Sequence, residues 1–206
     1  MRRMVAIVAA MLVAATSGFG QNGYSLPIAE AGAPTKQDQV WVAGGISVRD
    51  NILFVGGRGT WAYIDNLLVF GDLGWADVSG WDGGPAIQAG VLYTLPLQVP
   101  ADVAIRGTVY KPFIDSAVSI TGATLYGIVG KDLDAMIPGL SIYGGMGLDA
   151  SRSEVDYGGG GSRSEDSADV GLAAGAVFRF ADTLSCFAEL SYVDGTVLGA
   201  GARMEF

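Results

Sequence analysis

The sequence predicts an all-β fold, an up-and-down antiparallel transmembrane β-barrel, and three observations support this prediction. Half of the 206 residues are apolar and only 16% are charged, against roughly 25% in typical globular domains. Beyond residue 20, no apolar run approaches the roughly 20 residues that a membrane-spanning helix needs. Apolar residues instead alternate with Gly, Ser, Thr and charged residues in segments bounded by turn residues, which is the pattern of a membrane barrel.

Residues 1–20 have the layout of a secretory signal peptide. Two arginines precede an apolar core from Val5 to Ala15, and small residues follow it. The core is too short to anchor the chain in a membrane, so we expect cleavage near Gly20; a short buried helix is the alternative. Residues 21–38 contain Pro and Gly and show no periodicity, and we expect them to form a flexible periplasmic lead-in.

The barrel domain is expected to extend over residues 39–206, in which ten alternating segments can be distinguished. Most of them have about the 9 to 11 residues that a tilted membrane strand needs. Eight strands, with one hairpin outside the barrel, is the alternative. The ten segments are residues 39–49, 52–64, 67–78, 85–95, 102–112, 117–131, 139–151, 168–180, 185–193 and 196–206.

The connectors between these segments alternate in kind. Those after even-numbered segments are short, whereas those after odd-numbered segments vary and include the long stretch 152–167. Outer-membrane barrels have an even number of strands, short periplasmic turns and longer outer loops. The connectors therefore favour ten strands and place residues 152–167 in an outer loop.

The two faces of several segments differ in polarity. In residues 39–49, four apolar side chains alternate with Trp41, Ser47 and Arg49. A soluble β-sandwich would also alternate, but its solvated face would carry far more charge than these segments do. The pattern favours a wall with its apolar face toward lipid.

An internal repeat supports a barrel built from hairpins. "DNLLVFGDLGWAD" at residues 65–77 aligns without gaps with "DTLSCFAELSYVD" at residues 182–194. Each copy reads as a turn followed by a strand with one inward carboxylate, which is Asp72 in the first and Glu189 in the second. Repeated hairpins are the building unit of up-and-down barrels.

The stretches "YIDNLLVFGDLGWAD", "RFADTLSCFAEL" and "GAGARMEF" resemble the small bacterial outer-membrane β-barrel proteins, including the outer membrane protein A-like and OmpX-like barrels. The resemblance covers about residues 39–206. It implies a place in the lipid bilayer of the outer membrane, and the barrel-assembly machinery and periplasmic chaperones as partners. By this resemblance, Phe206 and Met204 form the C-terminal signal that the machinery reads. Small members of the family usually have eight strands, whereas ten are expected here.

Charged residues in the middle of strands are expected to point into the barrel, because a charge on the lipid face costs roughly 2 to 4 kcal/mol at mid-depth. Desolvated charges need partners, so we expect a charge network in the lumen. Glu189 lies opposite Arg179 or opposite Gly175, depending on the turn before it. In either case, Arg203 on the next strand is a candidate ion-pair partner for Glu189 in a diagonal position. The expected members are Arg58, Asp72, Arg106, Arg179, Glu189, Arg203 and Glu205.

One ion pair follows from strand register. If residues 64–66 form a three-residue turn, counting back along both strands places Arg58 directly opposite Asp72. Opposed side chains lie about 5 Å apart at Cβ, so the sequence predicts a salt bridge between these two residues.

Outward-facing aromatic residues are expected at the membrane interfaces, where rings with a polar edge are enriched. A ligand-binding box is the less favoured interpretation. Cys186, the single cysteine, is expected to face lipid as an inert apolar residue. The interface aromatics are Trp61, Tyr63, Trp75, Tyr93 and Tyr192.

The composition excludes several classes of function. The chain has no histidine, which removes His-assisted nucleophiles and His metal ligands, so neither an enzyme nor a cofactor is expected. Its net charge of −9 and the absence of a basic stripe argue against nucleic acid as a partner. The acidic stretch 152–167 lacks a Ca²⁺-coordination motif and is expected to be a solvated loop, or the surface for an unknown external partner.

The sequence therefore favours a barrel whose lumen is largely filled by side chains, with a structural or surface-interaction role. A small, weakly selective diffusion pore lined by the charge network is the alternative. A secreted, soluble β-sheet binding protein is the third possibility.

Overall fold

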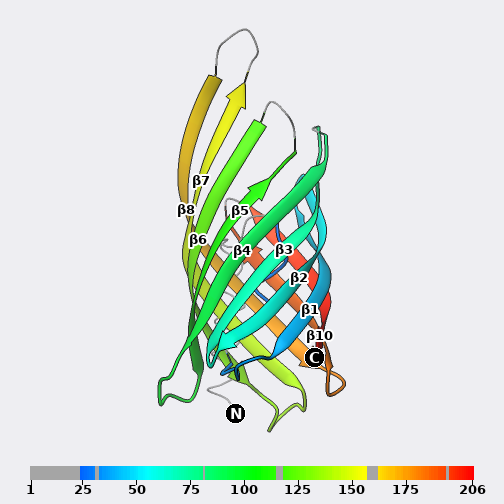
Figure 1. The fold of residues 1–206 in the computed structure, drawn as a ribbon, viewed down its shortest axis with the longest axis vertical. Coiled ribbons are helices and arrows are strands. Elements are labelled where there is room, and N and C mark those ends of the chain that lie inside the picture. The colour runs from blue at the N-terminus through cyan, green and yellow to red at the C-terminus, as the bar shows by residue number, and fades with distance from the viewer. Residues whose placement is uncertain (1–23, 31–32, 81, 115–117, 157–161, 194) are drawn as a thin grey trace.

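The computed structural model describes residues 24–30, 33–80, 82–114, 118–156, 162–193 and 195–206; the predicted signal peptide and its cleavage site lie outside them. Ten β-strands close into one barrel (Figure 1), so the prediction of ten strands rather than eight is confirmed. Within these ranges, no helix is long and apolar enough to cross a membrane. The strands are β1 Val40–Arg49, β2 Ile52–Ile64, β3 Leu67–Val78, β4 Gly84–Leu95, β5 Asp102–Pro112, β6 Val118–Asp132, β7 Leu140–Asp156, β8 Ser162–Arg179, β9 Leu184–Tyr192 and β10 Thr196–Glu205.

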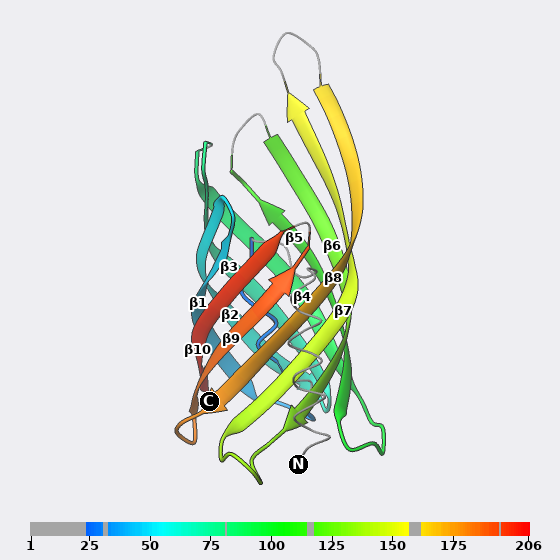
Figure 2. The ribbon, with the colours of Figure 1, turned by 180° about the vertical axis from the view of Figure 1, so that it is seen from behind.

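Every strand pairs in antiparallel fashion with its neighbours in the sequence, and β1 closes the barrel against β10. This is the predicted up-and-down meander. The closure includes the final residue, because the Phe206 N–H donates to the Val40 carbonyl at 2.9 Å. In the view of Figure 2, the C-terminus lies at the lower end of the barrel, together with the β6–β7 and β8–β9 turns.

Side chains alternate between the lumen and the exterior along each strand. In β1, Val42 and Ile46 are exposed, whereas Trp41 and Ser47 are buried inside, as the polarity of the two faces predicts. The exterior is apolar at mid-height, where Leu125 is among the most exposed residues. These outer apolar side chains therefore lie on the surface of the barrel and are not packed in its core.

Strands β6, β7 and β8 are longer than the others, with 15, 17 and 18 residues against 9 to 13 elsewhere. They rise above the rest of the barrel at the upper end (Figures 1 and 2). We call this extension the blade; it consists of residues 118–121, 152–156 and 162–166.

The blade corrects the prediction that residues 152–167 form a loop, since residues 152–156 and 162–167 lie in strands; residues 157–161 are outside the described residues. The β7–β8 pairing continues up to Asp156 and Ser162. The β7–β8 hairpin extends beyond the other strands, so neither of its faces packs against the barrel. Its sequence therefore needs no apolar face and carries no hydrophobic period. Backbone pairing, rather than burial, holds these residues in strands.

Candidate functional site

An extended segment of the chain, residues 24–30, lies inside the lumen. Leu26 and Ile28 are completely buried there, and they pack with the inward-facing side chains of the wall as one core cluster. Pro27 lies against Gly199 of β10, where a Cβ atom would collide with the proline ring. The structure therefore differs from the flexible periplasmic lead-in predicted for residues 21–38, since part of that range fills the barrel.

Arg58 of β2 connects this segment to the wall. Its guanidinium donates to both carboxylate oxygens of Asp72, at 2.6 and 2.8 Å. It also donates to three carbonyl oxygens and one carboxylate of residues 24–30. These acceptors are Leu26 O at 3.0 Å, Pro27 O at 2.7 Å, Ile28 O at 2.8 Å and Glu30 Oε2 at 3.2 Å. Every guanidinium nitrogen of Arg58 thus has an acceptor, and both of its ion pairs are shielded from water.

The predicted Arg58–Asp72 pair is confirmed, although the turn beside it differs from the expected one. Arg58 and Asp72 are direct partners in the β2–β3 register. The turn is one residue tighter than expected, since Ile64 pairs with Leu67, and an irregularity at Tyr63 restores the register. The two deviations cancel, which explains why the predicted pairing is correct.

Polar side chains of three strands, β3, β7 and β9, accept the backbone N–H groups of the segment. The Leu26 N–H donates to Asp72 Oδ2 at 3.2 Å, and the Ile28 N–H donates to Glu189 Oε2 at 2.9 Å. The Ala29 N–H donates to the Tyr143 hydroxyl, at 3.1 Å, which in turn donates to Glu189 at 2.7 Å. Glu189 thus binds the segment rather than an arginine of the wall.

The register of Glu189 matches one of its two predicted alternatives. It lies opposite Gly175 of β8, not opposite Arg179. A Cβ atom on Gly175 would collide with the Tyr143 ring, so the glycine makes room for that ring. This space lets the Tyr143 hydroxyl reach Glu189.

Arg106 of β5 is completely buried but differs from Arg58 in its surroundings. None of its three guanidinium nitrogens has a hydrogen-bond partner among the residues that the structure describes. Its guanidinium lies 4.6 Å from the centre of the Phe70 ring, and that of Arg58 lies 4.9 Å from the same centre. Arg106 is therefore in the lumen, as predicted, but it is held by an aromatic face rather than by the hydrogen-bonded network.

The other three predicted charges lie at the lower end. Arg203 donates to Ser185 Oγ at 3.3 Å and to the Ala29 carbonyl at 3.4 Å. Glu205 accepts from Gln39 Nε2 at 2.9 Å. Arg179 is well exposed and only 4.0 Å from Asp134. With part of the segment, these three residues line a recess of about 230 Å³, so they surround the entrance rather than the buried network.

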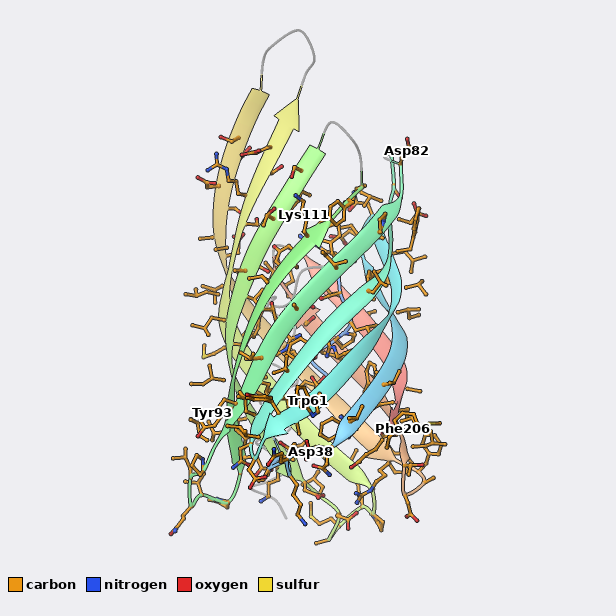
Figure 3. All side chains as sticks on the ribbon, in the orientation of Figure 1. Asp38, Trp61, Asp82, Tyr93, Lys111 and Phe206 are labelled. Atoms are coloured by element: carbon orange, nitrogen blue, oxygen red, sulfur yellow. The ribbon has the colours of Figure 1, made fainter. Side chains whose placement is uncertain are left out.

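The predicted interface aromatics face outward, and four of them, Trp61, Tyr63, Trp75 and Tyr93, are well exposed, with Tyr192 partly so. Figure 3 shows Trp61, Tyr93 and Phe206 near the lower end. The Trp61 and Tyr63 rings are packed edge to face, with their centres 5.2 Å apart. Met204, Phe206 and Cys186 also face outward. The assembly role of Met204 and Phe206 stays a prediction.

No family model matches the chain, and no curated protein matches it significantly. Solved structures that align with it include the N-terminal β-barrel domain of Pseudomonas aeruginosa OprF, with a TM-score of 0.41, 13% identity and coverage of 84% of this chain and 100% of that chain. Neisserial surface protein A aligns with a TM-score of 0.39, 17% identity and coverage of 84% and 99%. The KdgM porin aligns with a TM-score of 0.45, 10% identity and coverage of 81% and 99%. These similarities are too distant to assign a function to this chain.

Proposed function

We propose that this chain is an integral barrel of the bacterial outer membrane, exported by a cleaved signal peptide, that holds its blade outside the membrane as an interaction surface. The main observation in support of this proposal is the length of the blade strands. A wall of 9 to 13 residues per strand already suffices to span a bilayer, so the additional length of β6–β8 serves something beyond the membrane.

The exterior of the wall supports a place in the bilayer. Its most exposed mid-height side chains are apolar, among them Val91, Leu125 and Leu148. The charges of the central strands, including Arg58 and Asp72, point inward. A soluble barrel of this size would expose charge on that surface, and a membrane barrel avoids it because of the cost in lipid.

One edge of the blade extends beyond the neighbouring strand. β9 pairs with β8 only from Leu172 onward, so residues 162–171 extend past their neighbour on that side. β7 covers the opposite side of β8 along this whole length. An extended segment of a partner can add to such an edge through main-chain hydrogen bonds. The segment inside the lumen and the exposed edge of the blade together support a surface-interaction role.

Thiol labelling of intact cells tests the orientation on which this function depends. Cys186 is first replaced by serine. Ser164→Cys then places a thiol on the blade, and Met136→Cys places one in the exposed β6–β7 turn. A membrane-impermeant maleimide is expected to label the blade thiol in intact cells and the turn thiol only after permeabilisation. Labelling of the turn but not the blade would contradict the proposed function.

A further inference from the structure

We propose that residues 24–30 are a plug bound in a peptide-binding site of the barrel wall, and that the same barrel without the plug is an ion-conducting pore. This goes beyond the proposed surface role, because it assigns the closure of the lumen to a removable segment rather than to the wall itself.

The wall is built to bind an extended backbone. Arg58 provides donors for three carbonyl groups of the segment, while Asp72, Glu189 and Tyr143 provide acceptors for three of its N–H groups. The Ser47 hydroxyl adds a bond to the Ser25 carbonyl at 2.8 Å. These side chains project from β1, β2, β3, β7 and β9. Such convergence from separate parts of the wall is the property of a binding site, not of incidental packing.

The segment matches this site in charge as well. Between residues 24 and 30 its single ionisable acid is Glu30, which pairs with Arg58 at 3.2 Å. Among the described residues, Arg58 would keep Asp72 without the segment, whereas Glu189 would keep the hydrogen bond from the Tyr143 hydroxyl and lose the one from Ile28. The plug therefore satisfies groups that the wall leaves open.

Removal of the segment leaves a hydrated passage. A ten-stranded barrel lies between the eight-stranded type, which side chains can fill, and the wide porins. Here the extra width accommodates an extended chain, and Gly199 leaves space for Pro27. The vacated passage would be lined by Arg58, Asp72 and Glu189 on its hydrophilic part, beside the apolar side chains that now contact Leu26 and Ile28. Charged linings of this kind permit ion passage.

Planar-bilayer recording tests the proposal with two chains that share one wall. The first is the mature chain, residues 21–206, and the second lacks residues 21–32. Folding of both is verified by circular dichroism and heat-modifiable electrophoretic mobility. We expect the mature chain to be silent and the shortened chain to give steady openings. A synthetic peptide of residues 22–32, "NGYSLPIAEAG", is expected to block these openings, and a scrambled peptide is not.

A full-length variant covers the case in which the shortened chain does not fold. Glu30→Arg leaves the wall unchanged but places a like charge beside Arg58, so it is expected to produce intermittent openings. A folded shortened chain that stays silent would overturn the proposal, as would a mature chain that conducts as well as the shortened one. If only Glu30→Arg folds, its silence overturns the proposal. The labelling of Ser164→Cys is independent of these outcomes, so the plug and the surface role can fail separately.

Discussion

Replacement of Arg58 by alanine is expected to lower the free energy of unfolding by about 3–5 kcal/mol, the cost of removing one partner of a buried ion pair. The change leaves the Asp72 carboxylate buried without its counter-ion. It also removes the donors for three carbonyl groups of the plug. Because Arg58 is the residue on which wall and plug converge, no other single substitution in the lumen should cost more.

Urea unfolding of the refolded chain in lipid vesicles measures this loss. The double variant Arg58→Ala with Asp72→Ala is expected to lose less than Arg58→Ala alone, since no carboxylate is then left unpaired. Arg152→Ala is the matched control, because Arg152 forms an exposed pair with Glu154 at 2.9 Å and exposed pairs contribute about 0–1 kcal/mol. A loss in the double variant that equals or exceeds the loss from Arg58→Ala alone would contradict the coupling of Arg58 and Asp72.

Replacement of Leu125 by arginine is expected to destabilise the barrel by about 2–4 kcal/mol in a bilayer, the cost of a cation on the lipid face at mid-depth. Leu125 faces outward from the middle of β6 and is 57% exposed. The same substitution at Leu97, in the connector at the lower end, is expected to cost about 0–1 kcal/mol, as near an interface.

The measurement is again urea unfolding in vesicles, with both variants compared with the unchanged chain. The two leucines are similarly exposed, at 57% and 53%, so exposure alone predicts equal effects for them. A small, equal cost at both positions would show that the Leu125 surface is in water, and it would contradict the membrane placement.

Much of the wall could be predicted from the sequence because its information is local. Alternation along each strand sets which side chains face inward, and turn residues set the strand count. Prediction of the Arg58–Asp72 pair needed only the register of one hairpin. The tighter turn and the irregularity at Tyr63 cancelled there, so the predicted pairing was correct. The blade was missed as a pair of strands because both of its faces are solvated and carry no apolar period.

The plug could not be predicted in the same way because its partners are distant in the sequence. Ile28 bonds to Glu189 across 161 positions, and Ala29 bonds to Tyr143 across 114. No periodicity links an irregular segment to such partners. The one available signal was the apolar composition of "SLPIA" at residues 25–29, which is unusual for a solvated lead-in.

A disulfide between positions 27 and 199 tests the position of the plug most directly. Pro27→Cys and Gly199→Cys are combined with Cys186→Ser, because Pro27 and Gly199 are in contact inside the lumen. The control pairs Pro27→Cys with Leu198→Cys, whose side chain faces outward. Mild oxidation of the folded mature chain is expected to cross-link 27 to 199 and not 27 to 198, as read by mass spectrometry of the digested protein. Absence of the 27–199 cross-link in the folded barrel would contradict a plugged lumen.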